Sequence, residues 1–588
     1  MESTASDGRT NGQTNGHWGR FTAVLIAVSL GISLPALLSG YLWDDYFFTS
    51  RLIEGHSPFG YYDFGQTMRH SGLGPWWTSP GFTVRFFRPL SSATLHLDFA
   101  VWNAGPVSAH LHSAAWFSLL LVGAVRLLRT LLPVSTAKWA AVFFAVSSSH
   151  AFTVGWISAR HAAVGGAFAV WSVLYYVYWR QRGKRRDAVI SLGLFGLGLL
   201  SSETALSVAG VVLAYELAGA AGPLGSRLKA AAPTLAVAFV YVLLYKAAGY
   251  GAKGSGLYSD PTTQPMEFLA GLAPKLIYIV GTFVFGVHTS SAFMPGLGWL
   301  PLLAGGVGLA LGASALALGW RRLEPTERRL IKWLGLATLF GLGPSLASLP
   351  QGRSVILASL AFAGVAGLAL RGLLSAHPGG LRGVLQWSVA APLCFGLLIA
   401  SPAFRLGTSE FLRQQSKAEV TLGQKSMVTC RPGARTVVLN GGLLFALHAP
   451  FVMAAHGGPG KKLVGWHQLT EPATDIEVER KGRTGLVISG NGKPVVNVFM
   501  MNVVRPRTDD LVAGASIAGK HLRIKVLSNT PQGPTRVEFT IPGLHDPSRV
   551  CLLYYDGKRG VLRNATLPPR GQRLTIKWWK LKLWPPGD

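Results

Sequence analysis

The stretch GYLWDDYFFTSRL, residues 40–52, places two adjacent carboxylates, Asp44 and Asp45, directly after a long apolar run and among aromatic residues. A carboxylate can act as a general base on a hydroxyl group. When two neighbouring carboxylates are buried away from water, the pKa of one of them rises unless cations lie near. We therefore expect arginines close to this pair, holding both groups ionised, with one aspartate as the base and the other orienting it or the acceptor.

Other charged and polar residues lie at the ends of apolar runs and could complete such a site. They are Arg88 in FFRPL, Arg160 and His161 in HAFTVGWISARH, Glu203 in LLSSETAL, and Arg353 in LPQGRSVIL. Arginines bind phosphate through charge-assisted hydrogen bonds, and we expect Arg160 and Arg353 to do so while the other three shape the pocket. The set fits transfer of a sugar from a polyprenyl-phosphate to an acceptor hydroxyl, by positioning and electrostatic stabilisation of the departing phosphate. Each residue alone also fits an interfacial group that reaches to lipid headgroups.

The composition indicates a polytopic membrane protein that would hold these residues between its helices. Hydrophobic residues make up 49% of the 588 and charged residues only 14%, with a mean hydropathy of +0.33. Apolar runs long enough to cross a bilayer recur along the first two thirds of the chain. The expected spans are 21–42, 110–132, 137–156, 162–179, 188–202, 204–220, 231–249, 298–319, 331–349, 354–373 and 383–402.

Basic loops between these spans predict the orientation. Stretches such as RQRGKRR and RRLEPTERRLIK lie on one side of the predicted bundle, which the positive-inside rule makes cytoplasmic. Residues 267–290 look like a further span, but that would place RRLEPTERRLIK outside, so we expect a re-entrant segment or a broken hairpin. The result is about eleven crossings, a cytoplasmic N-terminus and an external C-terminus. All the candidate site residues then fall on the external side.

The predicted domains follow from these changes in composition. Residues 1–19 are polar and predict a disordered cytoplasmic tail, and residues 20–403 form the membrane domain, with a first external loop at 43–109. Residues 404–588 alternate short apolar strands with Gly, Pro and Asn turns, as in HLRIKVLS and RVEFTI, and predict a β-rich periplasmic domain. Cys430 and Cys551 lie in that domain and could form a disulfide; two cysteines in such a length leave this open.

Net charge is +29, and the C-terminal part from residue 404 carries 27 Lys and Arg against 12 Asp and Glu, a net of +15. The excess is better explained by short cytoplasmic loops and by anionic lipid headgroups or an anionic envelope polymer than by nucleic acid, which we do not expect as a partner.

Four segments carry a resemblance to a known family: WDDYFFTSRLIEG, FRPLSSATLHLDFAVWNAGPVSAHLHS, HAFTVGWISARHAAVGGAFAVWSVLYY and LLSSETALSVAGVVLAYEL. The chain resembles the multi-spanning GT-C glycosyltransferases, and among them the bacterial relatives of the transmembrane tetratricopeptide-repeat O-mannosyltransferases. The likeness covers about 41–220 well and 230–373 loosely, and it does not cover 404–588. It implies a GT-C bundle in a bacterial inner membrane.

The resemblance also implies roles for residues of this chain. The family's base corresponds to the pair Asp44 and Asp45, and its arginine after the third span to Arg160. The Arg-Pro-Leu arginine corresponds to Arg88, the glutamate of a Lys-Glu step to Glu203, and a late arginine near the donor phosphate to Arg353. Such enzymes use a polyprenyl-phosphate sugar on the non-cytoplasmic face and invert the anomeric centre.

Departures from the family limit what carries over. Ser202 stands where a lysine is expected and Ser113 where an asparagine is expected, and a β-rich segment replaces the tetratricopeptide array. The acceptor, whether a protein, a lipid or an envelope glycan, therefore stays open, and so does the sugar. No cofactor is certain. Whether a divalent metal takes part stays open. His110 and His112, which begin a predicted helix, are poorly spaced to bind one.

Two alternatives come from other classes of protein. A transporter or flippase of lipid-linked glycans also needs polar groups in a bundle, but typically near the bilayer midplane in two related halves. An inactive membrane anchor for a glycan- or lipid-binding β-domain would leave Asp44 and Asp45 dispensable.

Overall fold

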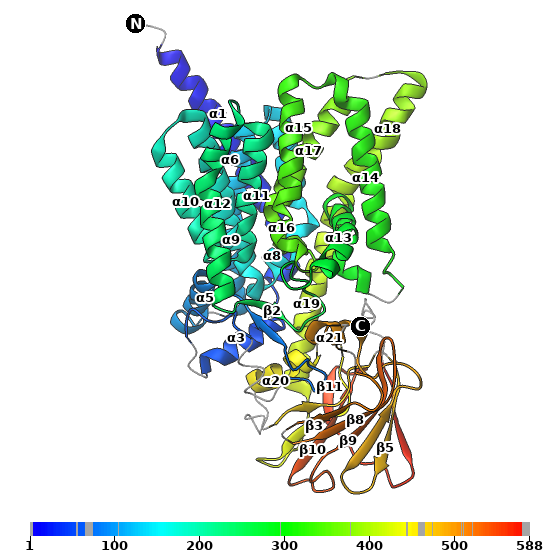
Figure 1. Cartoon of the computed structure of the whole chain (residues 1–588). Helices are drawn as coiled ribbons and strands as arrows, with labels where there is room; N and C mark the ends of the chain where they lie inside the picture. The colour runs from blue at the N-terminus through cyan, green and yellow to red at the C-terminus, as the bar shows by residue number, and fades with distance from the viewer. Residues whose placement is uncertain are drawn as a thin grey trace.

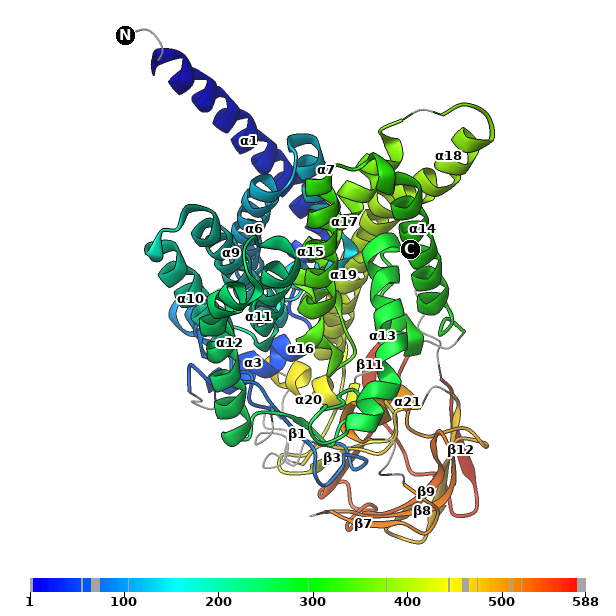
Figure 2. The ribbon, with the colours of Figure 1, turned by 45° about the horizontal axis from the view of Figure 1, so that its top comes forward.

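A computed structural model describes residues 4–53, 57–64, 74–103, 105–293, 296–376, 378–442, 445–456, 465–472, 474–506, 509, 511–519 and 521–578. A bundle of long helices forms one layer, and a domain of β-sheets lies beneath it at the end opposite the N-terminus (Figure 1). The tilted view in Figure 2 shows the same two parts, with α1 extending outward from the bundle. The chain is thus an α-helical bundle with a C-terminal β-sheet region, as the sequence predicts.

Thirteen of the described helices make up most of the bundle. The longer ones are α1 (Thr4–Ile32), α6 (Pro106–Leu131), α9 (Arg160–Arg182), α12 (Leu224–Ala247), α13 (Pro265–Phe285), α14 (Leu300–Gly319), α17 (Ile356–Leu374) and α19 (Ser401–Lys425). The shorter ones are α7 (Val134–Val146), α10 (Arg185–Leu199), α11 (Ser207–Ala214), α15 (Pro325–Gly341) and α18 (Gly380–Phe395). Among the described residues, seven helical stretches are long and apolar enough to cross a membrane.

Local sequence explains where several of these helices start and stop. Proline at the first turn, where a backbone N–H has no helical partner, opens α6, α13 and α15. Glycine in the left-handed conformation ends α9 at Gly183 (φ 72°) and α13 at Gly286 (φ 81°). The boundaries therefore follow ordinary capping chemistry.

The structure differs from the sequence-based expectation at three places. The expected disordered tail is helical from Thr4, because extending a helix that is already formed requires no new nucleation. The expected domain boundary at 403/404 lies inside α19, which continues to Lys425. The segment 267–290, expected to be re-entrant or broken, is mostly the single helix α13, whose 21 residues are enough to cross a bilayer. The count of eleven crossings stays a prediction.

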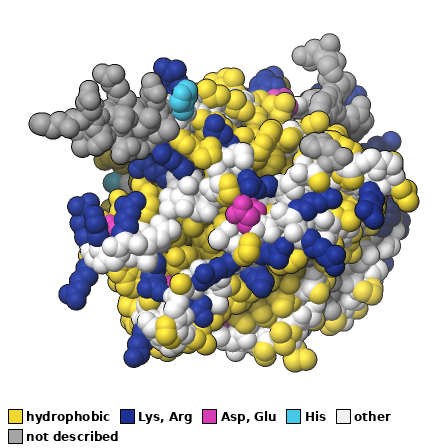
Figure 3. Space-filling model, turned by 90° about the horizontal axis from the view of Figure 1, so that it is seen from above, with side chains coloured by type: hydrophobic (Ala, Val, Ile, Leu, Met, Phe, Trp, Pro, Cys, Tyr) yellow, Lys and Arg dark blue, Asp and Glu magenta, His cyan; other side chains and the backbone are white. Residues whose placement is uncertain are grey.

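The end of the bundle at which α1 begins is rich in basic side chains. Seen from above, this face shows many Lys and Arg side chains and few Asp or Glu (Figure 3). The positive-inside rule associates this pattern with the cytoplasmic face. The orientation predicted from the loops agrees with this pattern and remains a prediction.

The described part of the loop 43–109, which the sequence predicts to be the first external loop, is folded against the bundle. It contains α3 (Asp44–Ile53), β1 (Thr83–Arg85), α5 (Pro89–His96) and the π-helical turn η1 (Leu97–Val101). Strand β1 pairs antiparallel with β2 (Gly251–Lys253), which follows α12. This small sheet fixes the first loop to a loop almost 170 residues later in the chain.

The described residues of the C-terminal domain form two sheets and two short helices. The four-stranded sheet has the order β11 (Val561–Asn564), β10 (Val550–Asp556), β3 (Arg435–Val438), β4 (His467–Gln468). The six-stranded sheet is antiparallel, in the order β12 (Arg573–Ile576), β5 (Ile476–Lys481), β6 (Gly485–Ser489), β9 (Gly533–Thr540), β8 (Arg523–Thr530), β7 (Ser516–Ala518). The alternation predicted for RIKVLS is present: Ile524 and Val526 of β8 are buried between exposed neighbours.

A disulfide joins Cys430 to Cys551 on β10, with Cα atoms 5.4 Å apart and a sequence separation of 121. The pairing that the sequence left open is therefore formed. Disulfides persist in oxidising compartments, which suits the predicted external location of this domain.

Candidate active site

A cavity of about 630 Å³ lies where the bundle meets the C-terminal domain. Its wall combines the first external loop, α12, the segment 343–354 and two C-terminal-domain helices, α20 (Phe445–His456) and α21 (Val498–Val504). Most of the lining is apolar or aromatic, with a small number of charged groups, as is typical of pockets that bind organic ligands. The sequence-predicted residues that line it are Asp44, Arg88, His161, Glu203 and Arg353.

The two neighbouring aspartates have different surroundings. Asp44 lines the cavity and about a third of its side chain is exposed (35%). Asp45 is fully buried and is not among the described residues of the cavity wall. Trp43, just before them, has a positive φ of 43°, uncommon for a bulky residue, and its backbone N–H donates to Glu419 of α19.

Asp45 connects two segments of the chain. Its carboxylate accepts hydrogen bonds from the backbone N–H groups of Leu42 (3.0 Å) and Ser158 (2.8 Å) and from the Ser158 hydroxyl. Burial raises the pKa of Asp45 to about 7, although these hydrogen bonds act in the opposite direction. The expectation that arginines would hold both aspartates ionised is therefore not met for Asp45, whose partners are neutral donors.

Arg353 lies in the short 3-10 turn η8 (Gly352–Ser354) and lines the cavity. Its guanidinium group lies over the ring of Trp156, 4.6 Å from the centroid, and Trp156 in turn packs edge-on against Trp43 at 5.3 Å. Within the described part of the chain Arg353 has no carboxylate in salt-bridge distance. Burial lowers its pKa, with Asp44 acting in the opposite direction. A cation of this kind is suited to bind an anion that enters the cavity.

Arg88, in contrast, already has a carboxylate partner. Its Nε donates to Glu203 Oε2 at 2.8 Å, and the hydroxyl of Tyr245 donates to Glu203 Oε1 at 3.2 Å. Burial lowers the pKa of Arg88, but the Glu203 carboxylate outweighs this and the net shift is upward. The pair therefore adds polar but nearly neutral lining to the cavity.

His161 lies at the start of α9 and its Nδ1 is 3.2 Å from the hydroxyl of Ser202. Ser202 is the position where the resemblance leads one to expect a lysine. His161 lines the cavity, whereas Ser202 is fully buried and is not among the described lining residues, so a neutral hydroxyl supports the imidazole from behind the wall.

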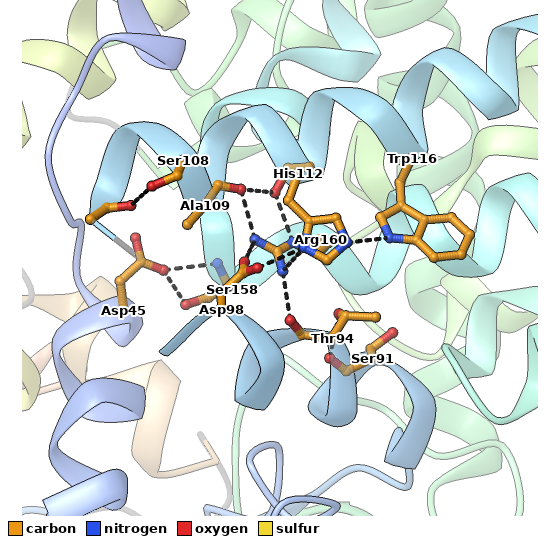
Figure 4. Close-up of polar contacts among 12 residues, drawn as sticks. Asp45, Ser91, Thr94, Asp98, Ser108, Ala109, His112, Trp116, Ser158 and Arg160 are labelled. Carbon is orange, nitrogen blue, oxygen red and sulfur yellow. Dashed lines mark hydrogen bonds and ion pairs between the residues drawn. The ribbon is translucent and has the colours of Figure 1, made fainter. Parts of the chain in front are cut away.

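Arg160 lies elsewhere. It is completely buried, ion-paired with Asp98 of η1 at 2.5 Å, and donates to the carbonyls of Ala109 (2.7 Å) and Thr94 (3.1 Å). Figure 4 shows its guanidinium group enclosed by these partners and by His112. Arg160 is not among the described residues that line the cavity, so the structure does not bring it to the expected phosphate site. With its hydrogen-bonding capacity used, it ties the first external loop to α6.

His110 and His112 have different partners. His110 is buried near Ser39, while His112 contacts Asp98 at 2.7 Å and accepts from the indole of Trp116 at 3.1 Å. In the described ranges, no group of three or more His, Cys, Asp or Glu side chains is arranged to hold a metal ion.

Two partners of the predicted site residues were not singled out in the sequence. Asp98 lies within the quoted segment FRPLSSATLHLDFAVW, where an acid in an apolar helix was a usable signal for a buried partner. His448 of α20 has its Nε2 3.3 Å from Asp44 Oδ1. It stands 404 residues from Asp44 in an unremarkable apolar stretch, so only the folded structure reveals it.

No protein-family model matches the sequence, and no curated protein is significantly similar to it. Solved structures are similar at low identity. An oligosaccharyltransferase of Archaeoglobus fulgidus aligns at 13% identity and a TM-score of 0.41, over 77% of this chain and 64% of its own. ArnT from Cupriavidus metallidurans aligns at 14% and 0.36, over 73% and 84%. The mycobacterial arabinofuranosyltransferase AftD aligns at 17% and 0.29, over 72% and 31%.

These neighbours are GT-C glycosyltransferases. None of the three is a tetratricopeptide-repeat O-mannosyltransferase. The chain spans less than two thirds of the length of the archaeal enzyme. Because all three TM-scores are below 0.5, no activity or residue role is transferred from these proteins to this chain.

Proposed function

We propose that this protein is a membrane glycosyltransferase that moves a sugar from a polyprenyl-phosphate donor to an acceptor hydroxyl, with inversion. The observation that carries the proposal is that a partly exposed carboxylate, Asp44, and a half-buried arginine without an acidic partner in the described chain, Arg353, line one cavity. A base and an anion-binding group in one apolar pocket are what this reaction requires.

The donor side of the cavity is the side formed by α12. Tyr241, Tyr245 and Lys246 of this helix line the cavity. Most of α12 is exposed in the protein, and it is apolar enough to face lipid. A polyprenyl chain can therefore lie in the bilayer against α12 while its phosphate reaches Arg353.

The reaction follows from these positions. Asp44 removes the proton from the acceptor hydroxyl as the acceptor oxygen forms a bond to the anomeric carbon. The bond between that carbon and the phosphate oxygen breaks, and its electron pair leaves with the phosphate. Arg353 stabilises the charge that develops there. Attack opposite to the leaving group in a single displacement inverts the anomeric centre.

The experiment uses the full-length protein in lipid nanodiscs with a panel of tritium-labelled undecaprenyl-phosphate hexoses and pentoses and an envelope extract as acceptor source. Asp44→Asn is expected to lower the transfer of label by about 10²–10⁴-fold, the usual contribution of a general base. Asp546→Asn, which removes a carboxylate from an exposed turn of the C-terminal domain, is the matched control and should behave as wild type.

Two results would contradict the proposal. Normal transfer by the Asp44→Asn enzyme would show that Asp44 is not the base. If in liposomes label crossed the bilayer still attached to its lipid, and none was transferred, the protein would be a transporter rather than a transferase.

A further inference from the structure

Helix α20 leaves the two sheets of the C-terminal domain and packs against α3, the helix that begins with the aspartate pair (Figure 1). Leu447 and Phe451 of α20 line the cavity. His448, between them in sequence, turns to Asp44, and His456, at the far end of the helix, lies 3.0 Å from the Tyr46 hydroxyl. The C-terminal domain therefore contributes to the cavity wall and to the surroundings of the proposed base.

His448 is placed to hold Asp44 rather than to meet a substrate. Its Nε2 is 3.3 Å from Asp44 Oδ1, and its side chain is 9% exposed, against 35% for Asp44. Asp44 is in the cavity wall, and His448 is not among the described residues that line it. Of this pair, the carboxylate thus faces the reacting groups and the imidazole lies behind it. This order differs from a triad in which the imidazole is the base and the acid orients it.

The imidazole also belongs to a row of aromatic rings that runs to the anion-binding arginine. The rings of His448 and Trp43 are 6.5 Å apart, Trp43 packs edge-on against Trp156 at 5.3 Å, and Arg353 lies over Trp156. Packing along this row couples the position of His448, the partner of Asp44, to that of Arg353 in the cavity wall.

We propose that His448 is a positioning residue for Asp44: its Nε2–H donates to Oδ1, orients the carboxylate toward the acceptor and favours its ionised form. This inference rests on the proposed function, because it assigns His448 to the same base. A donor to the charged form of a carboxylate favours that form, and a base is effective only when its orientation is held.

Titratable and charged groups from several elements surround Asp44. Asp45 of α3 and Glu419 of α19 are carboxylates close enough to interact with it electrostatically. Arg353 of η8 and Tyr258, after β2, also interact with it. Within the described ranges, His448 is the side chain within hydrogen-bonding distance of Asp44. Its removal should therefore shift the acid limb of the rate profile to higher pH.

The test measures donor-dependent transfer by the full-length protein in nanodiscs, with the labelled undecaprenyl-phosphate sugar that wild type uses best. His448→Ala is expected to lower kcat by about 10–100-fold, since a small misplacement of a reacting group has an effect of that size. The KM for the donor should stay within about twofold, because the phosphate site is intact. The pH of half-maximal rate on the acid side should rise.

His448→Gln supplies an N–H donor near the position of Nε2 and should recover most of the rate and restore the pH profile. His545→Ala is the control: it removes an exposed imidazole of the C-terminal domain that does not line the cavity, and it should retain wild-type kinetics.

The inference is overturned if His448→Ala keeps the wild-type rate and pH profile. It is also overturned if His448→Gln and His448→Ala lose rate equally with no change in the pH profile, because that result indicates a merely structural role. These outcomes are distinct from failure of the proposed function. An active Asp44→Asn enzyme would refute the base itself, whereas an inactive Asp44→Asn enzyme beside a normal His448→Ala enzyme would refute only the role of the histidine.

Discussion

Asp44 and Asp45 are neighbours in sequence, yet the fold gives them separate tasks. Asp44 faces the cavity and is held by His448, whereas Asp45 is buried and ties the start of α3 to Ser158 at the entry to α9. The exposed member suits acid–base chemistry on a substrate. The buried member suits the positioning of the segments that carry Asp44 and Trp156.

The raised pKa of Asp45 predicts a pH-dependent stability. Because its pKa in the folded protein is about 7, above the ordinary value of 3.8, folding favours the protonated form. Its contribution to the free energy of unfolding is therefore present at low pH and is lost as pH rises through the window from about 4 to 7, at about 1.4 kcal/mol per pKa unit. Asp45→Asn cannot titrate, so wild type should lose thermal stability relative to this variant between pH 5 and pH 8.

Differential scanning fluorimetry of both proteins at pH 5 and pH 8 measures this difference in Tm. Wild type and Asp45→Asn run at each pH are controls for one another, because every other titrating group is shared. An equal difference at the two pH values would mean that the Asp45 carboxyl titrates normally.

At the same scale, the sequence identified the residue types but not their partners. Asp44 and Arg353 could be predicted because charged groups at the ends of apolar runs have few structural reasons to be there. Arg160 belongs to a motif of the same kind, yet it pairs with Asp98. That pairing depends on how η1 packs against α6, and spacing along the chain does not reveal it.

At the scale of elements, the short turn η8 determines where Arg353 lies. A Cβ atom added to Gly352 would stand 2.4 Å from both the Cα and the carbonyl oxygen of Ser149. Real side-chain carbons do not approach a backbone this closely, so only glycine allows η8 to lie against the segment that precedes α8 (Ala151–Gly155). The close approach brings Arg353 over Trp156.

Gly352→Ala should therefore displace η8 and weaken donor binding. We expect the KM for the labelled donor to rise by about tenfold or more, with a loss of stability of about 1–3 kcal/mol from overpacking. Steady-state transfer kinetics and the thermal midpoint together measure this. Gly335→Ala is the control, since a Cβ there meets no atom within 4 Å and alanine favours a helix. Wild-type kinetics for Gly352→Ala would show that η8 does not need the close approach.

The elements themselves were predictable where one physical rule dominated. Long apolar runs predicted α6, α9 and α17, and the observed ends of these helices lie close to the predicted ones. The end of α19 could not be found in this way, because hydropathy falls at about residue 403 whereas the helix continues as a polar rod to Lys425. Leaving the bilayer ends the need for apolar side chains, but it does not end a helix.

At the scale of the whole molecule, the cavity belongs to neither part alone. The bundle supplies Asp44 and Arg353, and the C-terminal domain supplies α20 and α21 of the wall and the partner of Asp44. The two-part architecture could be predicted from composition. The junction could not, because it depends on contacts between α3 and α20, some 400 residues apart.

The most direct test is an electron cryomicroscopy structure of the protein in nanodiscs with undecaprenyl phosphate, the lipid that remains after transfer. The account predicts density for the phosphate inside the cavity that Asp44 lines, with its oxygens about 2.7–2.9 Å from the Arg353 guanidinium group, and for the polyprenyl chain along α12. A phosphate bound at the basic face where α1 begins, or on another flank away from Arg353, would contradict the account.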